Sequence, residues 1–541
     1  MKRIIFLLVI IVGIASFLRL YHLGGVPISP DWDEAALGYN AYSILLTERD
    51  EYGNFLPVIL TSFDDYKPAL YAYLAIPAIY IFDLNAFSVR LPSALMGIMA
   101  VMGTFFLTRQ LLNLQNSTSK RINYISLLAT GLFAISPWHI QFSRVAFEAN
   151  IALTLCIWGL YFFLLGLRKP IFLSASAIFY GLSINAYHSP RLFVPLFLLG
   201  LSIVFYKNLF KQKKYLLISI IVGMFFLIPF LALFTQGQSQ KITARYSATN
   251  IFNIQQEKSQ KESIIKKSSV QYSLFASPIP AGLIEIAHGY LSHFSLRWMF
   301  ITGDNDRHHA PSTGLLYIWE LSFMLLGIIS IFFSSKKARQ VFFLWFLLAP
   351  IPAAFTSEVP HAVRTLIWLP SLQIAVALGI ETAYVFLRRF SMVKQVVVIT
   401  IFLAVVIFSF IQYYQLYFTH MNLESSRFWQ FGYEHAVNFV EQNKSKYKNV
   451  YVSNQLEQPY IFFLFYLRYD PKLYLAAGGT KNSDKQAFDK FEFGKIDWSK
   501  KKQNKNALYI LGPYESKISP IRKVVHTIRY FDASEAIVFA E

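Results

Sequence analysis

The sequence predicts an α-helical polytopic membrane protein with a small C-terminal extracytoplasmic α/β domain. Hydrophobic residues make up 55% of the 541 residues and charged residues 15%, whereas ordinary soluble domains have roughly 45–50% and 25%. Apolar segments of the length that a spanning helix needs follow one another up to residue 416. Beyond that point hydrophobicity falls and charge density rises. We therefore expect a transmembrane catalytic domain at 1–416 and an accessory domain at 417–541.

Eleven apolar segments are predicted to cross the bilayer, and a further stretch at 68–82 is shorter and contains two prolines. That stretch is either a twelfth span or a helix lying in the membrane interface. The predicted spans lie near 4–20, 87–108, 123–137, 149–167, 171–187, 192–206, 215–235, 313–334, 340–356, 364–387 and 395–416. The first resembles a secretory signal, but Phe17-Leu18-Arg19-Leu20 offers no small-residue cleavage site, so we expect an uncleaved anchor.

Basic residues decide the predicted topology, because short cytoplasmic loops are rich in Lys and Arg. Fifteen of them form five short clusters: Arg109/Lys120/Arg121, Arg168/Lys169, Lys207/Lys211/Lys213/Lys214, Lys336/Lys337/Arg339 and Arg388/Arg389/Lys394. All five are cytoplasmic only if 68–82 lies in the interface. This places the N-terminus inside the cytoplasmic (plasma or inner) membrane and the C-terminal domain outside. The net charge of +19 then marks orientation, and we expect no nucleic-acid partner.

The outward segments include a first loop at 21–86 and a long loop at 236–312. In the tail, Phe428–Gln442 has helical periodicity, and 481–505 is polar and lysine-rich, which predicts a loop. Short strands are predicted at Asn449–Val452, Ala507–Leu511 and Val524–Ile528. The single cysteine, Cys156, excludes an internal disulfide and any cysteine-based metal site.

The first loop contains a group of three carboxylates, Asp31, Asp33 and Glu34, directly before a predicted amphipathic helix at 35–46. Acidic residues at this position cap a helix and favour its dipole. The alternative is a general base held at the membrane surface. Lys67, which precedes Pro68, either extends its ammonium group to the headgroups or holds a lipid phosphate as a point charge.

Further ionisable residues lie at other predicted outward positions. Arg144 and Glu148 are four apart, which suits either a simple ion pair or part of a site. Two tips each carry a His and an Arg, and their cationic character suits a phosphate. These pairs are His188 with Arg191, and His361 with Arg364.

The run Asp304-Asn305-Asp306-Arg307-His308-His309 contains ligand-type side chains. Adjacent histidines do not readily share one tetrahedral ion, and no second ligand pair has zinc spacing. The sequence therefore predicts no metal site. A divalent cation here is the less favoured alternative to substrate contact or a solvated loop.

Together these residues resemble the GT-C superfamily of lipid-phosphate-sugar glycosyltransferases over roughly residues 1–416, and most of all its family-39 enzymes, the protein O-mannosyltransferases and the aminoarabinose transferases of lipid A. Asp33-Glu34 is similar to the family's Asp-Glu motif, and Lys67-Pro68 to its Lys-Pro motif. Residues 90–95 resemble the start of the next span, and 361–366 the His-x-x-Arg stretch before a late span. Glu148 stands where many relatives carry an aspartate.

The resemblance implies a GT-C fold and transfer of a sugar, with inversion, from a polyprenyl-monophosphate donor to a glycan, lipid or protein acceptor. It implies no obligatory cofactor or catalytic metal. The implied catalytic residues are Asp33 as the base and Glu34, with Lys67, Arg191 and Arg364 on the donor phosphate. Arg144, Glu148, His188 and His361 are candidate substrate contacts.

Two other classes of protein compete with this interpretation. A multi-pass lipid or sugar transporter or flippase usually places ionisable residues near mid-membrane, whereas the carboxylates here cluster in predicted outward loops. A sensor whose tail is the functional part would leave the outward motifs without a role.

Overall fold

The computed structural model describes residues 2–63, 65–115, 118–235, 278–481, 486–496, 498, 506–519 and 523–541. Asp64, residues 236–277 of the predicted long loop, and 482–485, 497 and 499–505 of the predicted lysine-rich loop therefore lie outside the described residues. The chain forms two compact units. The first contains residues 1–21, 93–143 and 147–414, and the second contains 22–92, 144–146 and 415–541. The predicted first loop thus groups with the tail, while the domain boundary at 416/417 stays a prediction.

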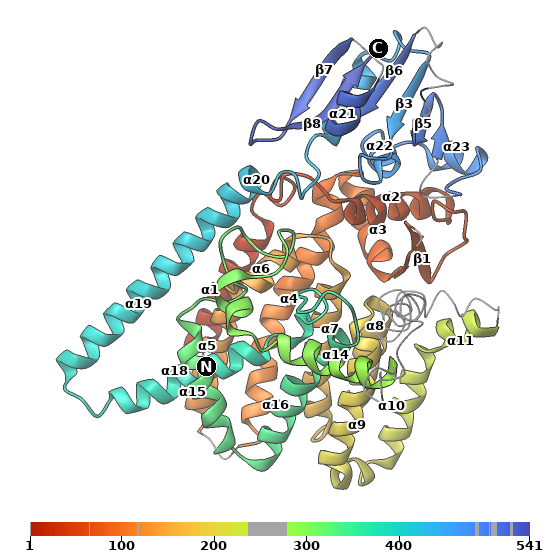
Figure 1. Ribbon diagram of the computed structural model, residues 1–541. Coiled ribbons are helices and arrows are strands. Elements are labelled where there is room, and N and C mark those ends of the chain that lie inside the picture. Colours follow the sequence, from red (N-terminus) through yellow and green to blue (C-terminus); the bar gives the residue numbers. More distant parts are fainter. Residues whose placement is uncertain are drawn as a thin grey trace, which may run out of the picture. The chain divides into compact units, whose positions relative to one another are not determined.

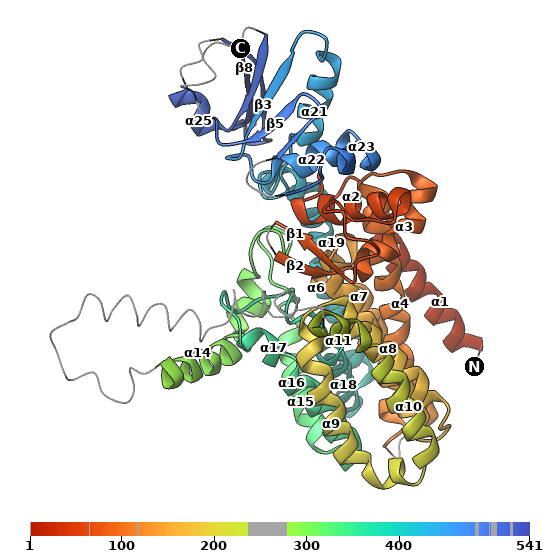
Figure 2. The ribbon, with the colours of Figure 1, turned by 90° about the vertical axis from the view of Figure 1, so that its right-hand side faces the viewer.

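The first unit is built from helices, which can be followed by their labels in Figures 1 and 2. Each of the eleven predicted spans overlaps a helix or a closely spaced pair of helices. The helices are α1 (Lys2–Leu20), α4 (Ala86–Leu112), α5 (Ser119–Ala134), α6 (Pro137–Arg144), α7 (Glu148–Gly166), α8 (Phe172–Ala186), α9 (Ser189–Phe210), α10 (Lys213–Phe225), α11 (Ile228–Thr235), α14 (Pro278–Ser292), α15 (Glu320–Phe332), α16 (Lys336–Leu348), α17 (Ile351–Ala354), α18 (Ser371–Leu387) and α19 (Met392–Gln415).

Within the described residues, six helices are long and apolar enough to cross a membrane, or seven if the bent pair α5–α6 counts as one span. The chain is therefore a multi-pass membrane protein. The other predicted spans correspond to shorter helices, such as α8 and α15. The total of eleven spans stays a prediction.

The helices α15 and α18 pack along each other at very close range (Figure 1). A Cβ atom on Gly327 would lie 1.7 Å from the carbonyl oxygen of Ala375, and one on Gly379 would lie 1.8 Å from that of Phe323. Small residues at a helix–helix contact let the backbones approach in this way. The two glycines therefore fix the spacing of this pair.

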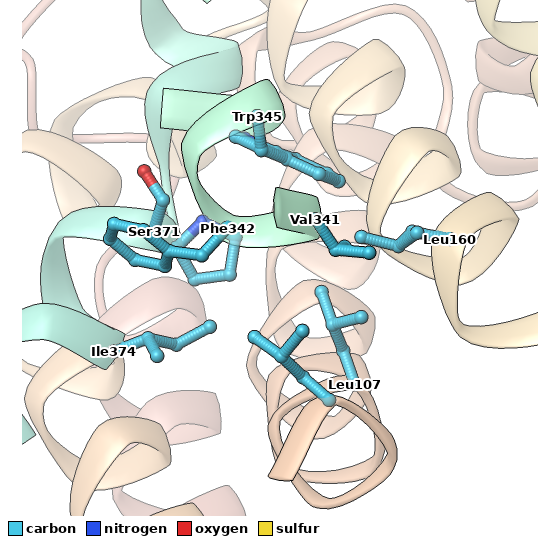
Figure 3. A pocket seen from close by; sticks show the side chains of 9 residues that line it. Leu107, Leu160, Val341, Phe342, Trp345, Ser371 and Ile374 are labelled. Atoms are coloured by element: carbon cyan, nitrogen blue, oxygen red, sulfur yellow. The ribbon is translucent and has the colours of Figure 1, made fainter. Parts of the chain in front are cut away.

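Figure 3 shows a small pocket between α4, α7, α16 and α18, lined almost wholly by apolar side chains such as Leu107, Leu160, Val341 and Ile374. Its volume is about 20 Å³, which is room for one or two water molecules at most. The pocket is a packing void between helices, and it is too small for a sugar or a lipid.

The second unit begins with α2 (Trp32–Thr47), a hairpin of β1 (Ile59–Ser62) and β2 (Asp65–Pro68), and α3 (Leu70–Phe82), all visible in Figure 2. With 13 residues, α3 is shorter than the ~20 that a span needs. The expectation that α2 is an amphipathic surface helix is wrong, because Glu34 to Ile44 are nearly all buried. Its faces are covered by α3, α22 (Pro459–Tyr466) and α23 (Pro471–Ala476).

The tail contains a six-stranded sheet with the order β4-β5-β3-β6-β8-β7, in which β3 runs parallel to β5 and β6. The three predicted strands are confirmed as β3 (Asn449–Ser453), β6 (Ala507–Leu511) and β7 (Val524–Arg529), and the predicted helix as α21 (Tyr433–Gln442). The tail also contains α20 (Met421–Glu424), α25 (Pro513–Ile518) and β8 (Glu535–Ala540).

The predicted loop at 481–505 is wrong where it contains β4 (Gln486–Phe488) and β5 (Phe491–Gly494), which pair antiparallel. Phe488, Phe491 and Phe493 are buried, while Ala487 and Glu492 are exposed. This alternation of buried and exposed side chains is that of a half-buried strand. The surrounding lysines conceal the pattern in the sequence.

Candidate active site

The amino end of α2 is capped by Asp31, and this contact settles which carboxylate of the acidic group caps the helix. The Oδ1 atom of Asp31 accepts from the backbone N–H of Glu34 at 2.9 Å, and the Oε2 atom of Glu34 accepts from the backbone N–H of Asp31 at 3.3 Å. This is a capping box. Asp33, in the first turn of α2, is therefore not the N-cap.

Glu34 is buried in an ion pair with Arg90 of α4. Arg90 Nε lies 2.9 Å from Glu34 Oε1, and Arg90 Nη2 lies 2.8 Å from Glu34 Oε2. The backbone N–H of Ala146 also donates to Oε1 at 2.9 Å. With Asp31, four N–H groups point at this carboxylate, so the contacts favour a role in positioning α2 over proton transfer.

Arg90 anchors the segment that leads into α2. Its guanidinium donates to three backbone carbonyls, those of Leu23, Pro27 and Ser29. Sequence reasoning noted this arginine only as part of a resemblance. An arginine near the amino end of an apolar helix could have predicted a buried ion pair, because a buried guanidinium requires an anionic partner.

Asp33 and Lys67 form a hydrogen-bonded ion pair between Asp33 Oδ1 and Lys67 Nζ. The Lys67 side chain is 7% exposed and the Asp33 side chain 40% exposed. Lys67 lies on β2 opposite Leu60, and its ammonium is 5.8 Å from the centroid of the Phe63 ring. The structure therefore brings together two of the predicted site residues, and it leaves the carboxylate accessible.

Arg144 is fully buried in the second unit. Its Nη2 donates to the carbonyls of His22 at 3.3 Å and Val26 at 3.0 Å. Its guanidinium lies 4.7 Å from the ring of Phe418 and 5.6 Å from that of Tyr417, both in η3 (Leu416–His420). These contacts suit an anchor between two segments, and a contact of Arg144 with substrate stays a prediction.

Glu51 is a buried carboxyl in the second unit that sequence reasoning missed. It accepts from Asn40 Nδ2 at 3.0 Å and from Thr480 Oγ1 at 2.8 Å. Burial raises the pKa of Glu51 to about 7, against the opposing effect of these hydrogen bonds. The Thr480 contact joins the first loop to the tail, and the sequence around Glu51 does not predict a partner 429 residues away.

The other predicted phosphate ligands lie in the first unit. Arg191 Nη1 is 3.0 Å from His188 Nδ1, and the Arg191 guanidinium is 5.0 Å from the centroid of the Phe230 ring. Arg364 donates to Thr356 Oγ1 at 2.7 Å and to a backbone carbonyl at 2.6 Å. Glu148 is the first residue of α7 and is half-buried.

The two His/Arg tips of the first unit lie side by side. Ser189 Oγ, between His188 and Arg191, donates to the backbone carbonyl of Arg364 at 2.8 Å. The cationic side chains predicted from two separate loops therefore belong to one region of this unit. Whether they bind the donor phosphate stays a prediction.

His361 lies in this same unit beside Asp304 and His308. His308 Nδ1 is 2.9 Å from Asp304 Oδ2, and His361 Nδ1 is 3.9 Å from the same oxygen. Burial alone would raise the pKa of Asp304, but the hydrogen bond from His308, the two imidazoles and the N–H of Ala362 hold it at about 2. Sequence reasoning did not join His361 to the run at 304–309.

Comparison with known proteins identifies the fold. No protein-family model and no curated protein matches the sequence. The structure is similar to ArnT from Cupriavidus metallidurans bound to undecaprenyl phosphate, with a TM-score of 0.57, 11% identity and coverage of 98% of this chain and 97% of that one. The apo form of the same ArnT gives a TM-score of 0.55 at 11% identity, with the same coverage.

A second similarity is to the archaeal oligosaccharyltransferase AglB from Archaeoglobus fulgidus, in complex with an inhibitory peptide and a dolichol-phosphate. The TM-score is 0.53 at 12% identity, with 85% of this chain covered, and the chain spans 63% of the AglB chain. Both neighbours belong to the GT-C superfamily. The chain therefore has the GT-C fold, which confirms the predicted fold class.

Proposed function

We propose that the protein is an integral-membrane glycosyltransferase that moves a sugar, with inversion, from a polyprenyl-monophosphate donor to a glycan, lipid or protein acceptor at the outer membrane face. The observation that carries the proposal is the ion pair of a partly exposed Asp33 with a nearly buried Lys67, next to the anchored Glu34. The undecaprenyl phosphate bound to ArnT and the dolichol-phosphate bound to AglB support a lipid-phosphate donor.

Lys67 is the proposed phosphate ligand of this site. A lysine ammonium is a compact charge that suits a phosphate oxygen, and burial of the lysine stem fixes its position. The arriving phosphate replaces Asp33 as the main ionic partner of Lys67. Donor binding then leaves the Asp33 carboxylate beside the bound sugar as a proton acceptor.

The chemical step is a single displacement. The acceptor's oxygen or nitrogen forms a bond to the anomeric carbon while its proton passes to Asp33. The bond from the anomeric carbon to the phosphate oxygen breaks, and polyprenyl phosphate leaves with the electron pair. Lys67 stabilises the charge that develops on this oxygen, and attack from the opposite face inverts the anomeric carbon. No step uses a metal ion.

Other residues keep their predicted or positioning roles. Glu34 and Arg90 hold the first turn of α2, so they are positioning residues for Asp33. Arg191 and Arg364 remain proposed as further phosphate ligands. His188, His361, Arg144 and Glu148 remain proposed as substrate contacts.

The test is sugar transfer from a polyprenyl-phosphate sugar by purified wild type and variants of matched stability. Asp33→Asn keeps the shape and can accept a hydrogen bond from Lys67, but it cannot take the proton, so transfer should fall by ~10²–10⁴-fold. Donor binding should change far less. Asp83→Asn is the matched control, because Asp83 is an exposed carboxylate at the end of α3. Near-normal turnover by Asp33→Asn would remove Asp33 as the base.

Lys67→Ala tests the other half of the pair. Losing a charge-assisted contact of ~1.5–3 kcal/mol should weaken donor use by roughly 10- to 150-fold. Unchanged donor kinetics would mean that Lys67 only neutralises Asp33. If the wild type transfers no sugar but moves lipid across vesicle membranes, the transporter interpretation replaces the proposal.

A further inference from the structure

We propose that Asp304, His308 and His361 form a binding site for one divalent transition metal ion of the zinc type, which joins two outward segments of the first unit. This inference goes beyond the proposed glycosyl transfer, and its site shares no residue with the Asp33–Lys67 pair. It assigns His361 to the metal ion in place of the substrate contact proposed above. Among the residues that the structure describes, this is the group of three His and carboxylate side chains whose ligand atoms lie together.

The spacing of the ligand atoms fits one ion. All three lie within 4.8 Å of one another, with 2.9 Å from Asp304 Oδ2 to His308 Nδ1 and 3.9 Å from Asp304 Oδ2 to His361 Nδ1. Bonds of about 2.0–2.1 Å around a tetrahedral zinc ion place ligand atoms about 3.3 Å apart. Each of the two distances therefore needs to change by only about half an ångström, which small side-chain rotations supply.

The chemistry of the three ligands selects the class of ion. Two imidazole nitrogens and one carboxylate oxygen are a donor set that Zn²⁺ accepts, with a fourth position left for water. Calcium and magnesium prefer sites made of oxygen atoms alone. The side chains of His308 and His361 are 11% and 13% exposed, so the site is enclosed but reachable from water.

Surrounding contacts orient the ligands. The backbone N–H of Ala362 donates to Asp304 Oδ2 at 2.6 Å, which aims the carboxylate at the segment that carries His361. The backbone N–H of His361 donates to His293 Nε2 at 3.2 Å, while His293 Nδ1 is bonded to the Gly289 carbonyl at 2.6 Å. Partners of this kind fix the orientation of ligands in metal sites.

Adjacent histidines do not readily share one ion, and the neighbouring His309 has other partners for both of its ring nitrogens. Its Nδ1 bonds the Ala310 carbonyl at 2.7 Å and its Nε2 bonds the Asp304 carbonyl at 2.6 Å. Gly303, at φ +67°, leaves room for this ring, because a Cβ there would lie 2.7 Å from it. His309 thus shapes the turn, and His308 alone of the two is a ligand.

The ion would connect segments that are far apart in sequence. Asp304 and His308 follow η1 (Trp298–Thr302), and His361 lies three residues before Arg364. A bound metal therefore fixes the segment that carries a predicted phosphate ligand. The proposed role of the ion is structural, because its ligands come from two loops of the first unit, which the ion would hold together.

The experiment uses the purified full-length chain, stripped of metal with a chelator and titrated with Zn²⁺ and with Co²⁺. We expect one ion per chain, visible absorption bands of tetrahedral Co²⁺, and a rise in the midpoint of thermal unfolding with Zn²⁺. His308→Ala and His361→Ala should each weaken Zn²⁺ binding by roughly 100-fold or more, since even changes to surrounding partners cost 10–100-fold. Asp304→Asn, which keeps the shape of the site, should do the same.

The matched control is His420→Ala. His420 forms an exposed pair with Glu424 in the second unit, with 3.0 Å between Nδ1 and Oε1. It offers a similar His–carboxylate contact, and within the described part of the chain no third ligand lies with it. Zn²⁺ binding in this variant should equal that of the wild type. The absence of stoichiometric Zn²⁺ binding, or binding that survives in all three ligand variants, would overturn the proposal. Metal binding is measured without sugar transfer, so its failure and that of the proposed function are distinct.

Discussion

Replacing Glu34 with Gln removes the anionic partner of a fully buried arginine. The Gln carbonyl can still accept from Arg90 Nε and from the N–H of Ala146, the two donors that now meet Oε1. Its NH₂ group would then face Arg90 Nη2 and the N–H of Asp31, so two hydrogen bonds become contacts between donors. Removing one partner of a buried ion pair costs about 3–5 kcal/mol. We expect a loss of this size in the free energy of unfolding.

Chemical denaturation of purified protein in detergent measures this loss. Glu48→Gln is the matched control, because Glu48 is exposed at the end of the same helix, and its change should stay within about 0.5 kcal/mol. In a double-mutant cycle, Glu34→Gln combined with Arg90→Gln should cost less than the sum of the single variants, with a coupling of about 1–3 kcal/mol. A loss below about 1 kcal/mol for Glu34→Gln, or strict additivity, would refute this account of the pair.

Three further predictions concern other parts of the chain. The pKa of Glu51 in the folded protein, about 7, exceeds its unfolded value, so the stability that this group supplies is complete below pH ~4.5 and is lost as pH rises through 7. The free energy of unfolding should therefore fall by about 3 kcal/mol over this range. Glu51→Gln should not show this fall when its free energy of unfolding is measured over the same pH series. Gly327→Ala should lower stability by about 1–3 kcal/mol or more through overpacking against α18, whereas Gly13→Ala, with open space around it, should not. A reporter fused after Lys120 should be cytoplasmic and one after Glu541 outside, and a cytoplasmic C-terminus would contradict the topology.

The fold could be predicted to the extent that composition determines it. Long apolar segments predict helices whatever their partners, because burial in lipid or in protein requires the same side chains and internal hydrogen bonds. The tail was harder, since its strands are short. Three phenylalanines, Phe488, Phe491 and Phe493, are the sequence feature that indicates the β4–β5 hairpin. The surrounding lysines lower the average hydrophobicity of the segment, so it reads as a polar loop.

The partners of the charged side chains could not be predicted. Glu34 and Arg90 are 56 residues apart, and Asp304 and His361 are 57 apart, so only the folded chain determines that each pair meets. The burial of α2 was also missed. Its small residues, Ala35 and Gly38 among them, indicated a helix closely packed on several faces, as the 2.6 Å approach of Val89 to a Cβ on Gly38 demonstrates.

Two adjacent carboxylates differ here in what they can do, and the geometry of the helix is the reason. Consecutive residues of an α-helix point about 100° apart, so Glu34 faces Arg90 in the interior while Asp33, with a 40% exposed side chain, faces Lys67 at the edge. A base needs a lone pair that a substrate can reach, and Glu34 has four N–H groups directed at its oxygens. The geometry therefore supports Asp33, rather than Glu34, as the proposed base, and the buried ion pair of Glu34 holds the helix turn that carries Asp33.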